Sequence, residues 1–565
     1  MFNKAAEKTT SLLILVGAPF VTVFLVTQTV TDPVNATKLA AAGGLGIALL
    51  SLTLFFNFKA LISENKLFLV LALSFIFAGI NAVLNSSSPT SQNIYGSFGR
   101  NTGFITYLVL LAIAIAALTL RETSSFKRII LGLQIAGIIN VLYCSWVLVF
   151  GDFLSWNNPY GNILGLFGNP NFISAFLGIF ITTILAGVVA PKTSWKYRIA
   201  GLLVALVAFY EVVDSSAIQG IVVTAGGMAI VGFFAVRAYL NSSIVTSAYV
   251  VTVLGVGVLA VLGALQKGPL TFIYKTSVSL RGAYWNAGIT MGMDHPLTGV
   301  GMDSYGDWYR RARSENAATV MPGPKTITNA AHNVVIDFFA YGGFPLLIAY
   351  LGMLLLAGIA AVKVIRRNKS YEPVFVAMFA AWSCYQVQSL ISINQVGLAL
   401  WGWILTGALI AYERATREQV AEPQSTSKKV APTKKQTASV FSPQLVAGLG
   451  VVVGLLIAVP PLSADTKWRS ALNSKDANKV MAALAPGYLN PSDSQRYAQA
   501  VQLFASSNLM DQAREIALKA TVYNPDYFDA WKILYYLSNT TEDEKALALK
   551  NMNRLDPRNP DVTAQ

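Results

Sequence analysis

Charged residues are scarce in this chain of 565 residues, because Asp, Glu, Lys and Arg together make up only 12% of it. A soluble protein has about 25% charged residues, and 54% of the residues here are hydrophobic. This composition excludes an ordinary soluble enzyme. At about 20 apolar residues for each membrane crossing, the hydrophobic residues suffice for about a dozen spans.

Cysteine and histidine are also rare. The two cysteines, Cys144 and Cys384, lie within apolar stretches and indicate neither a disulfide framework nor a metal site. No set of Cys, His and Asp has the spacing of metal ligands, and no glycine-rich loop has the pattern that binds nucleotide phosphates. We therefore expect no metal ion and no cofactor. The two histidines, His295 and His332, are the scarce candidates for proton transfer.

Long apolar stretches are present throughout the first four fifths of the chain, each about the length of a membrane-spanning helix. They lie near 11–30, 38–58, 67–84, 103–120, 129–150, 172–190, 199–213, 217–236, 244–265, 334–362, 373–393, 397–412 and 441–461. The first stretch is expected to be retained, since no convincing signal-peptide cleavage site follows Val30. The sequence predicts an all-α, polytopic transmembrane helix bundle of about 12 to 13 spans.

The net charge of +14 is distributed unevenly among the connections. If the N-terminus with Lys4 and Lys8 is cytoplasmic, every second connection carries an excess of Lys and Arg, as cytoplasmic connections do. These basic residues are Lys59, Lys66, Arg121, Lys127, Arg128, Lys192, Lys196, Arg198, Arg237, Lys363, Arg366, Arg367 and Lys369. The pattern predicts a multi-pass protein of the cytoplasmic membrane whose long loop 266–332 lies on the outer face.

The domain organisation follows from changes in composition. We predict a membrane domain over 1–412, a basic cytoplasmic linker over 413–440, one further span over 441–462, and an outer helical tail over 463–565. A miscounted span would reverse the side of the tail. Within the tail, Asn490-Pro491 recurs as Asn524-Pro525 after thirty-four positions and as Asp556-Pro557 after a further thirty-two. This period resembles a tetratricopeptide repeat, and the alternative is an unrelated helical bundle with chance turns.

His332 lies in Asn329-Ala330-Ala331-His332-Asn333, directly before an apolar stretch. A histidine at a membrane boundary can exchange protons and act as a general base; alternatively, it caps a helix. Asn333, Asp337 and Tyr341 follow at intervals of four on the same helical face, and an acid there is costly unless it is paired or in a wet cavity. Gly342-Gly343-Phe344-Pro345 predicts that the span itself begins near Pro345.

The outer arginines are candidate phosphate ligands, because a guanidinium binds phosphate through two parallel hydrogen bonds. Arg281 lies among aromatic residues, and its alternative role is to anchor the loop at the membrane surface. Arg100 is isolated among uncharged outer connections. Arg310, Arg311 and Arg313 form a cluster whose alternative is a solvated or lipid-headgroup face. His295, followed by Pro296 and two glycines, is expected to be a structural residue of a turn.

Four ordered motifs resemble those of the O-antigen ligase and polymerase superfamily over roughly residues 10–412. They are Gly99-Arg100-Asn101-Thr102-Gly103, Asn169-Pro170-Asn171, the run from Arg281 to Trp285 with Asp294-His295-Pro296-Leu297-Thr298-Gly299-Val300-Gly301, and His332-Asn333 before a glycine-rich span. The resemblance implies a GT-C-like membrane glycosyltransferase. Such an enzyme takes a glycan from a polyprenyl diphosphate at the outer face and joins it to a lipid, polysaccharide or protein hydroxyl.

By this resemblance His332 would activate the acceptor, Arg281 would hold the diphosphate, and Arg100 would be a second phosphate contact. Asn333 and Asp337 would also line the substrate site. One departure concerns Asp214-Ser215-Ser216-Ala217-Ile218-Gln219-Gly220, where the family usually has a Ser-Arg-Gly-like motif. Gln219 can hydrogen-bond but supplies no charge, so diphosphate binding would depend on Arg281, Arg100 or the cluster with Arg310 and Arg311.

Other functions remain open at this point. Within the enzyme class, the alternatives to a ligase are a Wzy-type polysaccharide polymerase and a protein O-oligosaccharyltransferase. Outside it, they are a transporter or flippase for lipid-linked glycans and an inactive scaffold. A transporter should have repeated halves and charges near the bilayer midplane, and neither is visible in the sequence. We expect a lipid-linked glycan, a glycan acceptor and a protein bound by the tail as partners, and no nucleic acid.

Overall fold

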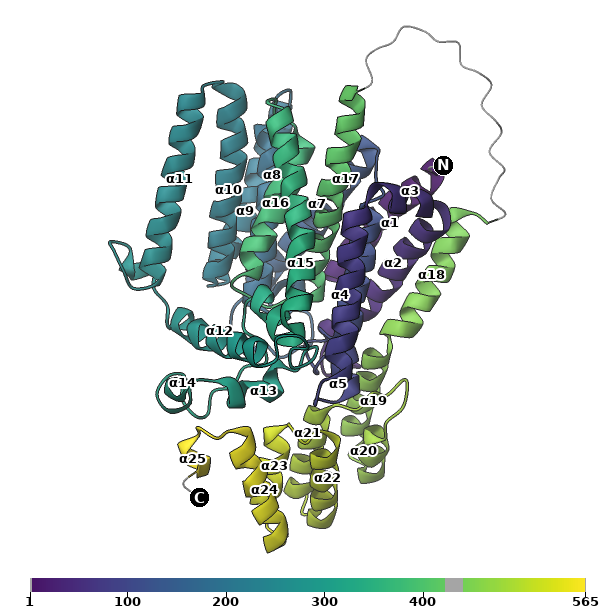
Figure 1. Ribbon diagram of the computed structural model, residues 1–565, viewed down its shortest axis with the longest axis vertical. Coiled ribbons are helices and arrows are strands. Elements are labelled where there is room, and N and C mark those ends of the chain that lie inside the picture. Colours follow the sequence, from purple (N-terminus) through teal and green to yellow (C-terminus); the bar gives the residue numbers. More distant parts are fainter. Residues whose placement is uncertain (1–2, 422–440, 564–565) are drawn as a thin grey trace.

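A computed structural model describes residues 3–421 and 441–563 as helices joined by irregular segments (Figure 1). Helices account for 75% of the residues that the structure describes, and this part contains no β-strand. The predicted all-α class and the helical membrane bundle are therefore confirmed. Part of the predicted linker, 413–421, continues the last helix of the membrane domain; the rest of it lies outside the described residues.

All thirteen predicted apolar stretches overlap helices, although the first helix ends at Val23, within the stretch 11–30. Nine helices of the described part are long and apolar enough to cross a membrane: α1 (Lys4–Val23), α2 (Asn35–Phe56), α4 (Lys66–Leu84), α7 (Thr123–Phe150), α8 (Pro170–Val189), α10 (Ile218–Tyr239), α11 (Ser243–Ala264), α15 (Val334–Arg367) and α17 (Val396–Ala421). A tenth span is possible if α18 (Pro443–Ala458) and α19 (Pro460–Ser474), bent by 52°, count as one. The chain is thus a multi-pass membrane protein.

Three further stretches explain why this count is lower than the predicted 12 to 13. Helices α6 (Phe104–Ala117) and α16 (Pro373–Ser389) have only 14 and 17 residues. Helix α9 (Trp195–Asp214) has 20 residues but carries charged residues at both ends. The 19-residue helix α12 (Thr276–Asp294) and several short helices complete the membrane domain. The short helices are α3 (Phe58–Glu64), α5 (Thr90–Tyr95), η1 (Gly165–Phe167), η2 (Thr271–Ile273), α13 (Tyr305–Ala312) and α14 (Glu315–Thr319).

The two ends of the helix bundle differ in what they carry. Helices α12, α13 and α14 and the C-terminal tail lie at one end, which we call the loop end, whereas α1 begins at the opposite end (Figure 1). Ion pairs join the basic connections at that opposite end: Arg121 and Arg414 both pair with Glu64, and Arg367 pairs with Glu413. Arg121, Arg414 and Arg367, which are predicted to be cytoplasmic, therefore lie at the same end of the bundle, and the side of the membrane on which each end lies stays a prediction.

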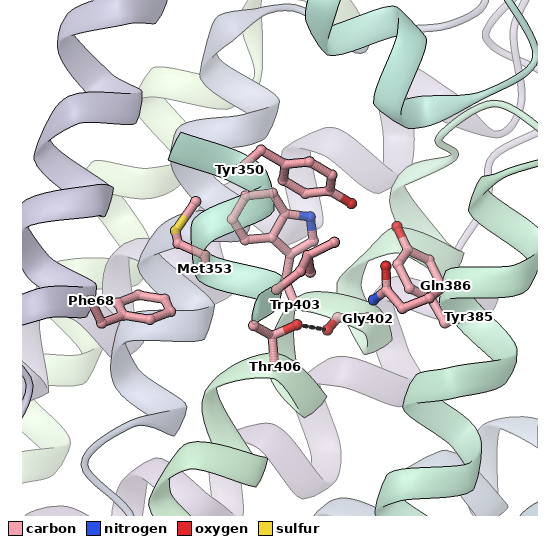
Figure 2. A pocket seen from close by; sticks show the side chains of 9 residues that line it. Phe68, Tyr350, Met353, Tyr385, Gln386, Gly402, Trp403 and Thr406 are labelled. Atoms are coloured by element: carbon pink, nitrogen blue, oxygen red, sulfur yellow. Dashed lines mark hydrogen bonds between the residues drawn. The ribbon is translucent and has the colours of Figure 1, made fainter. Parts of the chain in front are cut away.

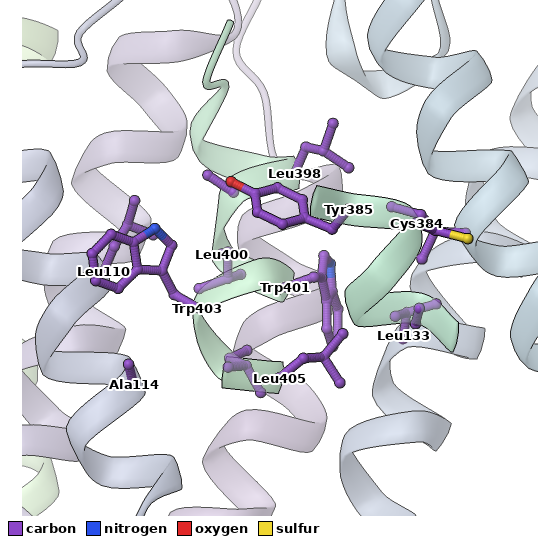
Figure 3. Packing of buried hydrophobic residues seen from close by; sticks show 14 of the residues in the cluster. Leu110, Ala114, Leu133, Cys384, Tyr385, Leu398, Leu400, Trp401, Trp403 and Leu405 are labelled. Carbon is purple, nitrogen blue, oxygen red and sulfur yellow. The ribbon is translucent and has the colours of Figure 1, made fainter. Parts of the chain in front are cut away.

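Large apolar side chains fill the centre of the bundle. Trp401 of α17 is fully buried and donates a hydrogen bond from Nε1 to Thr22 Oγ1 of α1 at 2.9 Å. Figure 3 shows Trp401 and Trp403 packed among leucines, with Cys384 and Tyr385 of α16 beside them. Both cysteines are free and buried. This packing holds α17 in the middle of the bundle, where it supports α15 and the site at the loop end.

Helix α15 breaks where the sequence predicts. Gly342 and Gly343 have non-helical backbone angles, and Gly343 has a φ of 62°. The segment after α12 fills the break, since the Val300 N–H donates to Ala340 O at 2.8 Å and the Phe344 N–H donates to Pro296 O at 2.8 Å. A side chain at Gly343 would lie 2.3 Å from Pro296 O. The Pro296–Gly301 motif therefore stabilises the broken helix by hydrogen bonds on both sides of the break.

The C-terminal tail is a second packed unit. It contains α19, α20 (Ala477–Leu484), α21 (Ser494–Ser506), α22 (Met510–Tyr523), α23 (Phe528–Tyr536), α24 (Glu542–Leu555) and α25 (Pro560–Thr563). Helices α21 and α22 pack as a pair, as do α23 and α24, around a separate core that includes Trp468, Phe504 and Trp531. The helical pairs flank the Asn524-Pro525 turn, and their identity as tetratricopeptide repeats stays a prediction.

Glycines join α18, the helix that leads into the tail, to α2. A Cβ atom at Gly454 would lie 2.1 Å from Gly43 O, and one at Gly450 would lie 2.6 Å from Ala48 Cα. Small residues at a spacing of four allow two membrane helices to approach closely. The position of the tail therefore depends on backbone contact between α2 and α18.

We expect Gly454→Leu to separate these two helices and to lower the free energy of unfolding by about 1–3 kcal/mol or more, because the side chain has no space. Thermal unfolding of the detergent-solubilised protein measures the loss. Gly448→Leu is the matched control on the same helix, since Gly448 is exposed and its Cβ would contact nothing within 4 Å. Equal melting temperatures for the two variants would contradict the proposed helix contact.

Candidate functional site at the loop end

His332 lies at the entry to α15, between two backbone anchors. The Ala331 N–H donates to Asp337 Oδ1 at 2.7 Å, and the side chain of Asn333 accepts from the N–H groups of Val335 and Ile336 at 3.0 and 3.2 Å. His332 itself has a φ of 57°, which is uncommon for a residue other than glycine. Asn333 and Asp337 therefore hold the backbone on both sides of the histidine in a sparsely populated conformation, as often occurs at functional sites.

The His332 imidazole is half-buried beside Tyr284, with 5.7 Å between the ring centroids. Burial lowers the pKa of His332 to about 3, and the positive charges of Arg100 and Arg281 lower it further in the same direction. The ring is therefore uncharged at neutral pH. No hydrogen bond within residues 3–421 and 441–563 engages its nitrogen atoms, so they are available to a substrate hydroxyl.

Arg281 of α12 is a cation with few partners. Its Nη1 atom makes only two long hydrogen bonds, of 3.5 Å, to the carbonyl oxygen and the hydroxyl of Ser277. Its Nε atom is buried without a partner, and burial lowers the pKa of the guanidinium. Arg281 forms no ion pair with any residue that the structure describes. Such a charge is poised to bind an anion.

Arg100 approaches the same histidine from the turn between α5 and α6. Its Nη2 atom donates to the side-chain oxygen of Asn329, three residues before His332. Its charge also acts on the buried carboxylates of Asp303 and Asp337. The structure therefore brings together Arg100, Arg281 and His332, although Arg100 and His332 are more than two hundred positions apart in the sequence.

Asp303 is a site residue that the sequence analysis missed. It is 1% exposed, and Oδ2 accepts from the Ser97 N–H at 2.7 Å and from the Ser97 hydroxyl at 3.1 Å. Burial raises the pKa of Asp303. The positive charge of Arg100 and the hydrogen bonds from Ser97 act in the opposite direction. Asp303 thus fixes the Arg100 turn against the segment after α12. The available signal was an acidic residue two positions after Gly301, in a loop with few acids.

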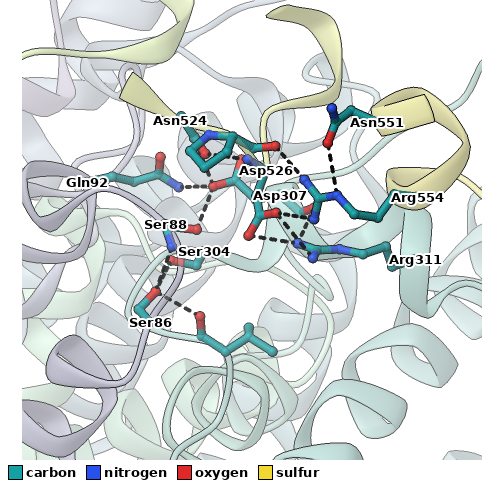
Figure 4. A network of polar contacts seen from close by, with 12 residues as sticks. Ser86, Ser88, Gln92, Ser304, Asp307, Arg311, Asn524, Asp526, Asn551 and Arg554 are labelled. Carbon is teal, nitrogen blue, oxygen red and sulfur yellow. Dashed lines mark hydrogen bonds and ion pairs between the residues drawn. The ribbon is translucent and has the colours of Figure 1, made fainter. Parts of the chain in front are cut away.

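Arg310 and Arg311 of α13 face the tail. Arg310 pairs with Asp556 at 3.0 Å, and Arg311 pairs with Asp526 at 3.3 Å, as Figure 4 shows. Arg313 is fully buried. Carboxylates of the tail match the charges of this cluster, so its contacts support neither the predicted phosphate-binding role of Arg310 and Arg311 nor the alternative of a solvated or lipid-headgroup face. Arg100 and Arg281 are left as the cations that face His332.

Gln219 lies at the start of α10 and is 3% exposed, and neither atom of its amide group has a hydrogen-bond partner. Lys275 donates to Ser216 O, in the turn just before α10, at 3.4 Å. No hydrogen bond within the described part joins Gln219 to His332. His295 packs edge-on against Trp308, with 4.8 Å between the centroids, which agrees with the structural role expected for it.

A small cavity inside the bundle does not contain any of these candidates. Figure 2 shows its lining, which includes the aromatic residues Phe68, Tyr350 and Trp403. The described residues also contain no group of three or more His, Cys, Asp and Glu side chains that could hold a metal ion. The chemistry-bearing side chains gather instead around His332.

These observations define the class of the protein as a multi-pass helical membrane protein with a histidine and two arginines clustered at one end of the bundle. The comparison with known families gives a narrower placement. Residues 173–351 match the family model described as O-antigen ligase, and this match supports the resemblance of the chain to the O-antigen ligase and polymerase superfamily. The matched segment includes Arg281 and His332 but neither Arg100 nor the tail. No curated protein matches the chain. The family indicates glycosyl transfer by an integral membrane protein, in general terms.

Proposed function

We propose that the protein transfers a glycan from a polyprenyl diphosphate to an acceptor hydroxyl at the outer face of the cytoplasmic membrane. The observation that carries this proposal is an uncharged, half-buried imidazole beside two guanidinium groups that have no ion-pair partner in the described part. A hydroxyl acceptor needs a base, and a diphosphate leaving group needs fixed positive charge. The uncharged imidazole can accept a hydrogen bond from that hydroxyl, and the two guanidinium groups supply the positive charge.

In the proposed reaction, His332 accepts the proton of the acceptor hydroxyl while the acceptor oxygen forms a bond to the anomeric carbon of the glycan. The bond between that carbon and the diphosphate oxygen breaks, and the diphosphate keeps the electron pair. Arg281 and Arg100 stabilise the charge that develops on the departing oxygen, which preorganised donors do most effectively in a site that excludes water. The energy of the reaction resides in the donor, so no nucleotide is required.

The direct test uses purified protein in proteoliposomes with a polyprenyl-diphosphate glycan and an acceptor lipid, polysaccharide or protein. We expect glycosylated acceptor and free polyprenyl diphosphate to accumulate in equal amounts. Loss of the donor without a glycosylated product would contradict the proposal. In cells that lack the active protein, accumulation of full-length lipid-linked glycan would indicate a ligase, and accumulation of single repeat units would indicate a polymerase.

The protonation of His332 gives a prediction that needs no substrate. Because burial and the two arginines lower the pKa of His332 to about 3, the ring should stay uncharged as the pH falls from about 8 to about 5, through the ordinary histidine range. NMR spectra of protein labelled at histidine should show two signals, since the chain has two histidines. His295→Phe leaves the signal of His332 alone. A His332 signal that titrates near the ordinary value of about 6.5 would contradict the prediction.

A further inference from the structure

The three repeated turns of the tail lie along one edge and face the membrane domain. At the first turn, Ser492 O accepts from the Ser91 hydroxyl at 3.0 Å, and Asp493 Oδ2 accepts from the Phe98 N–H at 3.2 Å. At the second, the amide of Asn524 donates to Asp307 Oδ2 at 3.2 Å, within the network of Figure 4. At the third, Asp556 binds arginines that lie at and just beyond the end of α13. The sequence period of the tail is thus also the spacing of its contacts with the membrane domain.

The third turn makes the most deeply buried of these contacts. Asp556 and Arg313 both have fully buried side chains, and the two Oδ atoms of Asp556 lie 2.7 and 2.8 Å from Arg313 Nη2. Arg310 Nη1 donates to the same carboxylate at 3.0 Å. A charge buried to this degree is tolerated only with its partner. Arg313 therefore depends on the tail for its compensation.

Arg313 also holds the segment that leads to the histidine. Its Nη1 atom lies 3.3 Å from Gly323 O, 3.4 Å from Pro324 O and 3.5 Å from Thr326 O. A few residues further along the chain, Asn329 receives the hydrogen bond from Arg100, and His332 follows. One guanidinium group thus connects the tail carboxylate to the backbone of the His332 segment.

A second connection runs through α13 itself. The Tyr305 hydroxyl donates to Tyr284 O at 2.5 Å, and the rings of Tyr309 and Tyr284 lie 5.8 Å apart. Tyr284 in turn packs beside His332. Helix α13 therefore contacts the tail through its arginines and contacts the surroundings of His332 through its tyrosines.

We infer that the tail completes the transfer site, with Asp556 acting through Arg313 as a positioning residue for His332. This inference rests on the proposed function of His332 for its effect on the reaction. Its structural part does not depend on the proposed function, because it concerns only how firmly the backbone of residues 323–332 is held. The tail is then part of the catalytic unit, and its other surfaces remain free to bind a partner.

The test is Asp556→Asn in the full chain, which keeps the shape of the side chain and removes its charge. Hydrogen exchange of residues 323–332 should become about tenfold to a hundredfold faster, because Arg313 loses its counter-ion and Arg310 keeps only its longer ion pair with Asp529. The rate constant kcat of transfer should fall, whereas the KM for the donor should change little. The pKa that the NMR signal of His332 reports should rise toward the ordinary value for histidine. Asp561→Asn, an exposed acid on α25, is the matched control.

The possible outcomes distinguish failure of this inference from failure of the proposed function. Unchanged exchange of residues 323–332 in Asp556→Asn, with the tail still protected, would overturn it. If Asp556→Asn unfolds the tail, Arg558→Met decides instead, because exposed Arg558 donates to the carbonyl oxygens of Arg311 and Arg313 at 2.8 and 2.7 Å without burying a charge. That variant should also speed exchange over 323–332, and no change would overturn the inference. Absence of transfer in the unmodified protein would contradict the proposed function, while the exchange and NMR measurements still decide the positioning role.

Discussion

Replacing His332 by asparagine is expected to lower transfer by about 10²–10⁴-fold, the usual contribution of a general base. Asparagine is chosen because it tolerates the left-handed backbone conformation that His332 adopts. The variant therefore removes the base with little strain. His332→Ala should cause the same loss of activity and, in addition, a small loss of stability, because alanine is disfavoured at this backbone angle.

The measurement is the initial rate of glycan transfer in proteoliposomes, with thermal unfolding as the check on folding. His295→Phe is the matched control, since it removes the other histidine and keeps an aromatic ring against Trp308. We expect this control to retain transfer. Undiminished transfer by His332→Asn would exclude His332 as the acceptor base, and the alternative of a helix-capping histidine would then stand.

Replacing Arg281 by glutamine is expected to lower transfer by about 10²–10³-fold, which is the effect of losing one donor that stabilises transition-state charge. Arg281→Lys should recover only part of this loss, because a point charge replaces a planar fork that can bind two phosphate oxygens. The dependence of the rate on donor concentration separates a weaker KM from a lower kcat. A loop anchor would behave differently, since lysine can also extend to the membrane surface.

Lys267→Gln provides the control for net charge, because it removes one positive charge from an exposed position of the same loop. We expect its donor dependence to equal that of the unmodified protein. If Arg281→Lys and Arg281→Gln both keep the original donor dependence, Arg281 is an anchor and Arg100 must bind the diphosphate alone. If the Lys267 control loses as much activity as Arg281→Gln, the effect is one of net charge and not of a specific contact.

The helices could be predicted from the sequence because the signals for them are local. Most apolar stretches are long enough to span a membrane, and the Asn169-Pro170 pair begins α8, with the Asn169 side chain accepting from the Asn171 N–H at 2.9 Å. The break in α15 was also predictable, because Gly342 and Gly343 precede Pro345. The candidate site was predictable in part, since His332, Arg281 and Arg100 belong to recognisable motifs.

The remaining features depend on which distant segments meet. Asp303 reaches the Arg100 turn only because the segment after α12 fills the break in α15. Arg310 and Arg311 seemed free in the sequence because their partners, Asp556 and Asp526, lie more than two hundred positions away. The charges of residues and their spacing along the chain do not predict such long-range ion pairs. Only the packing of helices at the loop end determines whether an arginine faces a substrate or a carboxylate.

The close approach of α18 to α2 at Gly43 and Gly454 has a consequence for how the tail is held. Ion pairs that remain partly exposed, such as that of Arg310 with Asp529, contribute about 0–1 kcal/mol each and would not join two separate molecules firmly. A short covalent connection can raise the local concentration of a bound segment to about the millimolar range. By fixing α18 in the membrane bundle, the glycine contact keeps the tail at such a concentration beside α13. A tail produced as a separate chain should therefore compete poorly for this surface, even though every contact that it makes there is unchanged.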